Sequence, residues 1–288
     1  MIDLHVHSNH SDGTLSPEEL VTLAIKSNVS AFALTDHDTV SGIPKAKKAA
    51  ACASSSGTPV TVISGTEISA AYKKKDIHIL GLFINEQDPV LQQALEEAVT
   101  ARDLRNEKMA ERFRSLGIPF TLDDLRRENP DTVITRAHFA NYLIGHNFVK
   151  TSQEAFRRYL GYDSPCFVPR EYMPPERAIS LILNAGGIPV LAHPLLYKLP
   201  PEELEALLKR LTDAGLKGLE VYYSSNTGFD EQICYSLANR FHLLMTGGTD
   251  FHGDNKPNLF LGSGRNNNLN IPEQLLISLE QHLKTQRS

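Results

Sequence analysis

The chain opens with an alternation of apolar and polar residues that is typical of a β-strand. The apolar positions are Ile2, Leu4 and Val6, with Asp3, His5 and His7 between and after them. Because successive side chains of a strand point to opposite faces, His5 and His7 share one face, about 7 Å apart along the strand. Two imidazoles so placed can bind one metal ion, although an exposed polar strand face would give the same pattern. A predicted turn over 8–13 returns the carboxylate of Asp12 to the same end of the strand.

Apolar strand-like segments then alternate with amphipathic helical ones. We expect further strands at 31–35, 60–63, 77–83, 188–192, 218–222 and 243–246. A first helix should begin at Pro17, where Ser16 and Glu19 have the spacing of a capping box. Other helices are expected at 43–54, 175–184, 201–214, 230–241 and 272–283. Strands and helices that alternate with short links indicate an α/β protein with a parallel sheet or barrel.

The pattern changes between residues 99 and 170. Strand-like runs disappear there, and helical patterns such as 104–116 and 136–144 dominate. This stretch has 12 Lys or Arg and 9 Asp or Glu residues, a net charge of +3 in a chain whose net charge is −5. We expect a helical insertion that leans over the mouth of the barrel, between a first barrel part at 1–98 and a second at 171–288. A solvated helical face without a role would also explain the charge bias.

The composition is that of an ordinary globular protein. The 288 residues suffice for one large domain or two smaller ones, and 41% of them are hydrophobic. The negative net charge argues against binding of polyanions by bulk electrostatics. No apolar run approaches the ~20 residues of a membrane span, and no export signal is recognisable. The scattered cysteines, Cys52, Cys166 and Cys234, are expected to be free thiols in a reducing cytoplasm.

Potential metal ligands gather at or near the ends of the predicted strands. They are His5, His7, Asp12, His37, Glu67, His78, His193, Asp250 and His252. In parallel β/α barrels, strand ends that are far apart in sequence converge at one mouth, where active sites lie. The set as a whole is therefore a candidate active site, although His78, inside a strand, would also fit a core histidine with a satisfied hydrogen bond.

The chemistry of these side chains favours catalytic divalent ions. Imidazole and carboxylate ligands suit Zn, Mn or Fe, and the absence of cysteine ligands argues against a structural zinc. The set exceeds what one ion can use, so two or three ions with a bridging carboxylate are expected. Such a cluster lowers the pKa of bound water and holds the oxygens of a phosphoryl group, which favours phosphoester hydrolysis.

Several short motifs occur in the order that is found in a known family. They are His5-Val6-His7-Ser8, Ser11-Asp12-Gly13, Thr35-Asp36-His37-Asp38, Gly65-Thr66-Glu67, Asp76-Ile77-His78, Ala192-His193-Pro194 and Thr249-Asp250-Phe251-His252. Together they resemble the PHP (polymerase and histidinol phosphatase) family over essentially the whole chain outside the insertion. The resemblance implies a distorted (βα)7 barrel with a trinuclear metal centre.

The resemblance also implies a role for each ligand. The first ion would be held by His5, His7, Glu67 and Asp250, the second by Glu67, His78 and His193, and the third by Asp12, His37 and His252. Some family members have His in place of Asp12, but a carboxylate there still suits a hard divalent ion. Because no ligand position is vacant, an active enzyme is expected, with Mn²⁺ favoured and Fe²⁺ or Zn²⁺ as alternatives. We expect Glu67, Asp250 and His193 to act catalytically, and Asp38 to orient His37 or to donate a proton to the leaving oxygen.

The insertion, through Thr135-Arg136-Ala137-His138, resembles that of compact bacterial members. Those members act as 3′,5′-nucleotide (nucleoside bisphosphate) phosphatases and as 5′-to-3′ exoribonucleases on short RNA. Arg136 and His138 would then bind a substrate phosphate, unless they are a surface arginine and a helix-packing histidine. Tyr222, after a strand end, would stack on a base or line the pocket.

We therefore expect a phosphoesterase that acts on nucleoside 3′,5′-bisphosphates or on the 5′ end of short RNA. A histidinol-phosphate phosphatase or another small-molecule phosphomonoesterase would share the metal centre. A non-catalytic metal or nucleotide sensor could be built on the same barrel. Neither a membrane nor a stable protein partner is expected.

Overall fold

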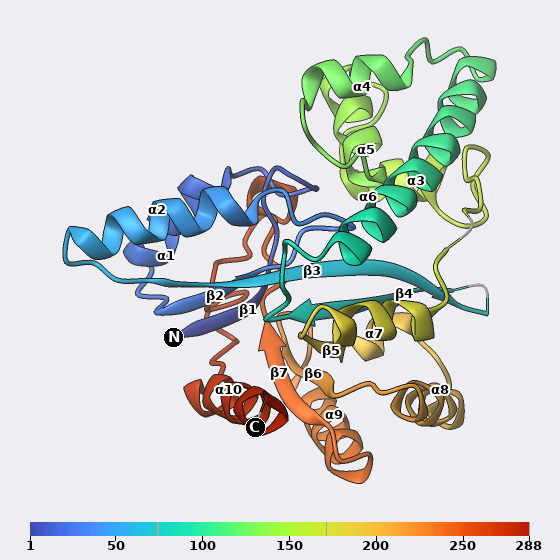
Figure 1. The fold of residues 1–288 in the computed structure, drawn as a ribbon. Helices are drawn as coiled ribbons and strands as arrows, with labels where there is room; N and C mark the ends of the chain where they lie inside the picture. Colours follow the sequence, from blue (N-terminus) through green and yellow to red (C-terminus); the bar gives the residue numbers. More distant parts are fainter. Residues whose placement is uncertain (74, 171, 288) are drawn as a thin grey trace.

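The computed structural model describes residues 1–73, 75–170 and 172–287, and one seven-stranded sheet in the order β1 to β7 forms its centre (Figure 1). The strands are β1 (Ile2–Val6), β2 (Ala31–Leu34), β3 (Thr61–Tyr72), β4 (Lys75–Leu82), β5 (Ile188–Leu191), β6 (Gly218–Tyr223) and β7 (Leu244–Gly248). A parallel bridge joins Val6 of β1 to Phe251, three residues after the end of β7, so the sheet nearly closes. The predicted distorted (βα)7 barrel is confirmed.

Strand β4 runs opposite to both of its neighbours. It pairs antiparallel with β3, from Gly65 opposite Leu82 to Tyr72 opposite Lys75, and antiparallel with β5. The other neighbouring pairs are parallel, so the expectation of a wholly parallel sheet is wrong at β4. The physical reason is the very short link between β3 and β4, which permits a hairpin but no helical crossover. Strand β3 also continues to Tyr72, well beyond the expected end at residue 63.

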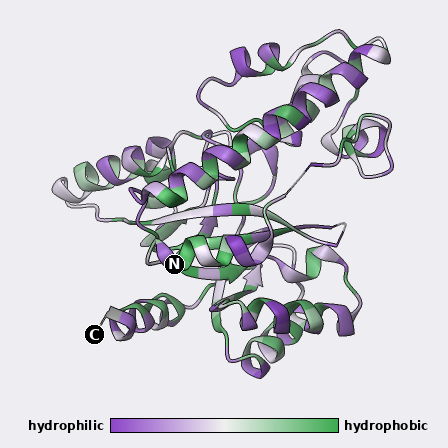
Figure 2. Ribbon diagram, turned by 45° about the vertical axis from the view of Figure 1, so that its right-hand side comes forward, coloured by the Kyte–Doolittle hydropathy of each residue, from purple (hydrophilic) through white to green (hydrophobic). Residues whose placement is uncertain are grey.

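Six helices pack around the sheet (Figure 1). They are α1 (Pro17–Lys26), α2 (Ile43–Ser55), α7 (Pro175–Asn184), α8 (Pro201–Asp213), α9 (Gly228–Arg240) and α10 (Glu273–Arg287). Helix α1 begins with the predicted capping box, in which the Ser16 and Glu19 side chains each accept a hydrogen bond from the other residue's backbone N–H. Figure 2 shows hydrophilic and hydrophobic positions alternating along the helices, as amphipathic packing against a sheet requires.

The insertion rises from the barrel on a single long helix (Figure 1). It comprises α3 (Pro89–Ser115), α4 (Leu122–Glu128), α5 (Arg136–Gly145), α6 (Ser152–Ala155) and a π-helical turn, η1 (Phe156–Leu160). The start of α3 buries Leu91 and Leu95 in the barrel core, whereas Phe113 near its end belongs to a separate core with Phe120 and Phe139. The predicted boundary between residues 98 and 99 therefore falls inside one continuous helix, and the division of the chain into three parts stays a prediction.

Two expectations from composition can be compared with the structure. None of the helices in the described ranges is long and apolar enough to cross a membrane. Cys52 is exposed and Cys166 and Cys234 are buried, and all three are free thiols.

Candidate metal centre

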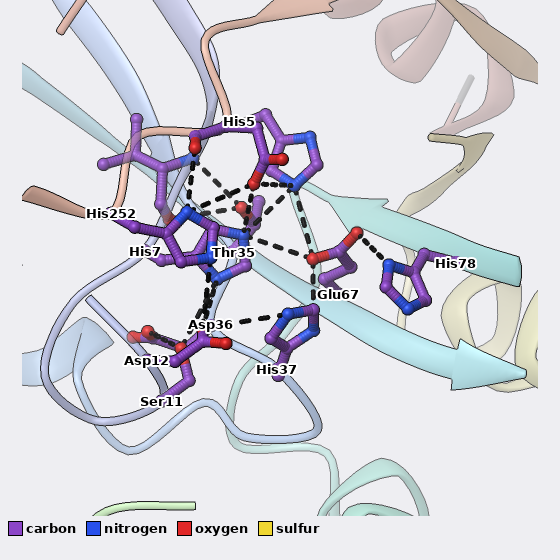
Figure 3. Close-up of polar contacts among 12 residues, drawn as sticks. His5, His7, Ser11, Asp12, Thr35, Asp36, His37, Glu67, His78 and His252 are labelled. Atoms are coloured by element: carbon purple, nitrogen blue, oxygen red, sulfur yellow. Dashed lines mark hydrogen bonds and ion pairs between the residues drawn. The ribbon is translucent and has the colours of Figure 1, made fainter. Parts of the chain in front are cut away.

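All nine predicted ligands lie together at one end of the sheet, and Figure 3 shows most of them. They form four overlapping groups in which the ligand atoms lie within 4.8 Å of one another. The groups are His7, Asp12, His37 and His252; His5, His7 and Glu67; His5, His193 and Asp250; and His37, Glu67 and His78. Residues from position 5 to position 252 thus meet at one site that can hold metal ions, and which ion each group holds stays a prediction.

The reversed strand explains how two of the ligands reach this site. Glu67 lies in the middle of β3, beside His37, with which it forms a bridge. His78 lies near the start of β4, opposite Ser69 of β3. Because β4 runs antiparallel, its beginning lies at the rim where the parallel strands end, so a ligand at the start of a strand joins ligands from strand ends.

Three site residues in the loops that follow strands β2, β5 and β7 have positive φ angles. The φ angles are 54° for Asp38, 27° for His193 and 57° for Asp250. Such conformations cost about 1–3 kcal/mol each in non-glycine residues and persist where surrounding contacts enforce them. Their backbone N–H groups donate to Glu67 O (3.0 Å), Glu220 Oε2 (2.7 Å) and His5 O (2.9 Å), respectively. The sharp turns at the rim are therefore held by the site itself.

Glu67 lies at the centre of the histidines (Figure 3). Its Oε2 atom faces His5 Nε2 at 3.3 Å, His7 Nε2 at 3.2 Å and His37 Nδ1 at 3.1 Å. Its Oε1 atom faces His78 Nδ1 at 2.7 Å and His193 Nε2 at 3.1 Å. Burial alone would raise the pKa of Glu67, but the charge of His78 holds it well below its usual value. An ionised carboxylate with a different histidine set at each oxygen is suited to bridge two cations.

Asp250 also presents its two oxygens to different partners. Its Oδ1 atom lies 3.4 Å from His7 Nε2 and 3.3 Å from His252 Nδ1. Its Oδ2 atom accepts a hydrogen bond from the Tyr223 hydroxyl at 2.8 Å and forms an ion pair with Lys256. One oxygen is thus fixed by neighbouring donors, which aims the other at the imidazoles.

Asp12 shows the same division, with a donor from the insertion. Its Oδ1 atom lies 3.1 Å from His252 Nε2, and Oδ2 accepts a hydrogen bond from the Thr135 hydroxyl at 3.1 Å. Thr135 is the N-cap of α5, so this helix of the insertion touches a predicted ligand of the third ion.

Several buried polar atoms at this site lack the partner that a cation would supply. Within the part of the chain that the structure describes, Asp12 Oδ1, His37 Nδ1 and His193 Nδ1 neither accept nor donate a hydrogen bond. His5 Nε2 and His7 Nε2 face each other at 3.1 Å. Buried polar groups without partners are costly, and this imidazole and carboxylate set matches divalent ions such as Mn, Fe or Zn. The residues present therefore fit a cluster of divalent cations.

Two of the predicted histidine ligands, His37 and His7, differ in the direction of their pKa shifts. Burial lowers the pKa of His37 to about 3, so this imidazole is neutral and ready to ligate. Burial acts on His7 in the same direction, but hydrogen bonds to Asp250 and Glu67 raise its pKa to about 9. The two carboxylates thus attract positive charge to the position of His7, which a metal ion would satisfy in place of a proton.

A cavity of about 360 Å³ lies between these ligands and the insertion. Besides seven of the ligands, its wall includes three arginines, Arg102, Arg105 and Arg136, and three aromatic residues, Phe156, Tyr172 and Tyr223. Two of the arginines are paired: Arg102 donates to Asp38 at 2.5 Å and Arg136 donates to Asp76 at 2.9 Å. Arg105 is only 5% exposed and forms no hydrogen bond or ion pair within the described residues, and its Nε atom is unpartnered. The cavity therefore offers a positive charge that forms no ion pair with any of the described residues.

The predicted substrate-binding residues differ in position. Arg136 lines the cavity, although its guanidinium pairs with Asp76. His138 is buried, and its Nδ1 atom accepts a hydrogen bond from the backbone of Thr135 in a capping box at the start of α5. Tyr222 does not line the cavity, whereas its neighbour Tyr223 does. These geometries favour Arg136 as a binding residue over the other two.

Asp38, the predicted proton donor, lies behind the metal ligands in an ion-pair network. Arg102 and Arg170 approach its Oδ2 atom at 2.5 Å and 3.5 Å, and its Oδ1 atom accepts from the backbone of Ser69. Burial would raise the pKa of Asp38, but the two guanidiniums hold it well below its usual value. A carboxyl that stays ionised is a poor acid, so the geometry favours an orienting role next to His37.

Two residues that the sequence did not single out also belong to the site. Glu220 lies in β6 with both oxygens used: Oε1 is 3.0 Å from His5 Nδ1 and Oε2 accepts from the backbone of His193. The signal was an acidic residue between Leu219 and Val221, inside an apolar strand. Arg105 had no such signal, because arginines are common on helices.

Comparison with known proteins finds a family model, related enzymes and a solved structure that match this chain. The family model described as PHP domain matches residues 3–165. A 5′-3′ exoribonuclease of Haemophilus influenzae is 35% identical over 250 residues, which cover 87% of this chain and 89% of the relative. A 3′,5′-nucleoside bisphosphate phosphatase of Chromobacterium violaceum is 35% identical over 254 residues, 87% of each chain. A solved amidohydrolase structure from Chromobacterium violaceum, with bound sulfate and no metal, has a TM-score of 0.84 at 32% identity and covers 97% of this chain and 96% of that one.

Proposed function

This chain belongs to the PHP family, and from that premise we propose that it removes phosphate from nucleoside 3′,5′-bisphosphates. Family membership makes it a metal-dependent phosphoesterase. The substrate class is our proposal, and one observation carries it. The guanidinium of Arg105 is buried, has no ion-pair partner in the described parts of the chain and lines the same cavity as the metal ligands. A substrate with two phosphate groups can place one at the ligand cluster and the other at Arg105.

The charge balance of the cavity supports a second anionic group. On the side of the insertion, the described residues Arg102, Arg136 and Arg170 pair with only two carboxylates, Asp38 and Asp76, so this arginine cluster carries a positive surplus before Arg105 is counted. Burial, together with Arg102 and Arg136, lowers the pKa of Arg105 to about 9. A phosphate group would offset the repulsion between Arg105 and the neighbouring arginines. A guanidinium is suited to bind phosphate through two parallel hydrogen bonds.

The residues of the chain then have separate roles. The imidazoles and carboxylates of the nine-residue set hold the cations, which when bound lower the pKa of water and neutralise charge on the phosphate that is hydrolysed. Tyr223 and Lys256 keep Asp250 in its orientation, and Thr135 does so for Asp12. The insertion covers the cavity and contributes its arginines.

Trimming of short RNA from its 5′ end is a second candidate. Phe156 and Tyr172 line the cavity beside the arginines, and Leu196, also in its wall, is 48% exposed. Aromatic rings next to a basic surface can stack on the bases of single-stranded nucleic acid. The exoribonuclease relative adds weight to this candidate.

A phosphate-release screen with Mn²⁺ tests the proposal. Its substrates are adenosine 3′,5′-bisphosphate, adenosine 3′-phosphate, adenosine 5′-phosphate, histidinol phosphate and a 5′-phosphorylated oligoribonucleotide. We expect the highest kcat/KM for the bisphosphate. A higher value for histidinol phosphate would replace the proposed substrate class, and a higher value for the oligonucleotide would favour the second candidate. Binding of nucleotide without any turnover would favour a sensor.

A further inference from the structure

Glu220 is a fully buried carboxylate directly behind the metal ligands. It lies in β6 and is 0% exposed. Its Oε1 atom is 3.0 Å from His5 Nδ1, and its Oε2 atom accepts a hydrogen bond from the His193 backbone N–H at 2.7 Å. No lysine or arginine within the described residues forms an ion pair with it. A buried carboxylate is costly unless hydrogen-bond donors compensate it, and here both donors belong to predicted metal ligands.

The two ring nitrogens of His5 face opposite ways. Nδ1 points to Glu220, whereas Nε2 points to Glu67 Oε2 at 3.3 Å and Asp250 Oδ1 at 3.6 Å. A carboxylate acceptor at Nδ1 favours the tautomer with the proton on Nδ1 and leaves the Nε2 lone pair free. Carboxylates placed behind metal-ligating histidines commonly act in this way.

The second oxygen of Glu220 controls the backbone of another ligand. His193 has φ 27° and ψ 59°, a conformation that non-glycine residues rarely adopt. Its N–H group donates to Glu220 Oε2, and its Nε2 atom lies 3.1 Å from Glu67 Oε1. The same carboxylate therefore holds the turn that directs the second imidazole toward the centre of the site.

We propose that Glu220 is a positioning residue that holds His5 and His193 ready to bind metal ions at the same time. This proposal depends on one part of the proposed function, which is that the site binds divalent cations. A carboxylate suits this task because both of its partners are donors. An amide of the same size has one acceptor and one donor end, so it cannot satisfy His5 Nδ1–H and His193 N–H together.

The test is Glu220→Gln, compared with Glu86→Gln. Glu86 binds Lys47 and the Ser64 hydroxyl away from the site, so the control makes the same chemical change elsewhere. Mn²⁺ content after dialysis and Mn²⁺ binding by titration calorimetry are measured for both variants and the wild type. We expect Glu220→Gln to bind at least one ion 10- to 100-fold more weakly, and Glu86→Gln to match the wild type. A merely structural Glu220 would lower the melting temperature in chelator and leave Mn²⁺ stoichiometry and affinity unchanged, which would overturn the proposal.

A measurement on the zinc-loaded wild type tests the proposed orientation of His5 even if the Glu220→Gln variant does not fold. Long-range ¹⁵N–¹H NMR spectra, with the His5 signals assigned by their absence in His5→Gln, report which ring nitrogen carries the proton. We expect a proton on Nδ1 and none on Nε2, and the reverse result would overturn the proposal. Both measurements are independent of turnover, so failure of the substrate screen would leave them informative.

Discussion

At the scale of single residues, the site is governed by carboxylates that divide their oxygens between imidazoles and supporting donors. Asp250 and Asp12 do this, whereas Glu67 faces imidazoles with both oxygens, and all three carboxylates are ionised in their surroundings. Hydrogen bonds to Asp250 and Glu67 raise the pKa of His7 to about 9. Metal ions and protons therefore compete for the same electrostatic position.

This competition predicts that Mn²⁺ affinity rises with pH. His7 must lose its proton to ligate, and with a pKa of about 9 it is protonated in the metal-free protein at neutral pH. We expect affinity to increase up to tenfold per pH unit between pH 6.5 and 8.5 from this residue. Calorimetry in buffers of different ionisation enthalpy should show proton release on Mn²⁺ binding at pH 7. Absence of release would contradict the proton assignment at His7.

Arg105 offers a prediction about substrate binding. Arg105→Gln should lower kcat/KM for adenosine 3′,5′-bisphosphate by 10- to 100-fold, because hydrogen bonds to a charged group contribute roughly 1.5–3 kcal/mol. Adenosine 3′-phosphate lacks the second phosphate, so its kcat/KM should hardly change. Arg177→Gln, in an exposed ion pair with Glu97, is the matched control and should leave both substrates unaffected. Equal losses on both substrates would remove Arg105 from second-phosphate binding.

Asp38 offers a prediction about stability. Asp38→Asn would leave Arg102 and Arg170 buried without their counter-charge, at a cost of about 3 kcal/mol in the free energy of unfolding. The pKa of Asp38 is lower in the folded than in the unfolded chain, so its contribution is complete above the unfolded pKa of about 4 and is lost as pH falls further. Urea unfolding in chelator should therefore show a large wild-type advantage at pH 7 that narrows below pH 4. A difference independent of pH would contradict this assignment.

At the scale of secondary-structure elements, helix α5 joins the insertion to the metal centre. Its N-cap, Thr135, accepts from the Ala137 N–H and donates to Asp12 Oδ2. Thr227 caps α9 with the same type of capping box and does not line the cavity. The two threonines thus share one structural role, and only Thr135 has a second one.

This pair predicts two separable effects. Thr135→Val and Thr227→Val should each lower the free energy of unfolding by about 1 kcal/mol through loss of the cap. Only Thr135→Val should also weaken Mn²⁺ binding, by about tenfold, because Asp12 loses the donor that orients it. Chemical denaturation and Mn²⁺ titration of both variants provide the comparison. Unchanged Mn²⁺ binding in Thr135→Val would show that Asp12 is oriented without this hydroxyl.

The sequence predicts a helix or strand well where its hydrophobic periodicity and its end signals are local. The helix Pro175–Asn184 was predicted with both ends, because its proline start and apolar face are local features. The direction of β4 was not, since strand periodicity carries no direction and the link from Tyr72 to Lys75 lacks an Asn-Gly or Asp-Gly signal. The ligands could be found because they stand at strand ends, whereas Glu220 and Arg105 depend on partners that only the folded chain brings near.

At the scale of the whole molecule, the insertion has a hydrophobic core separate from those of the barrel, and the ligands belong to the barrel. The barrel supplies all nine ligands from segments between residues 5 and 252. The insertion has its own core, in which Phe113, Phe120 and Phe139 pack together. Polar contacts join the two parts, among them Arg102–Asp38, Arg136–Asp76 and Thr135–Asp12. The metal cluster should therefore stabilise the barrel directly and the insertion only indirectly, through contacts between the two parts.

Removal of the ions should therefore destabilise the barrel more than the insertion. Cations that bind only the folded chain stabilise it by about 2.7 kcal/mol at a hundredfold excess over Kd, so EDTA should lower the melting temperature and Mn²⁺ should restore it. Hydrogen exchange resolves where this stability is lost. We expect faster exchange in chelator around β1 and β7, whose ends are joined by the Asp250 N–H to His5 O bond, and little change in the core of the insertion around Phe113. Equal acceleration in both parts would mean that the insertion unfolds together with the barrel, and no acceleration anywhere would mean that the clustered imidazoles and carboxylates are stable without cations.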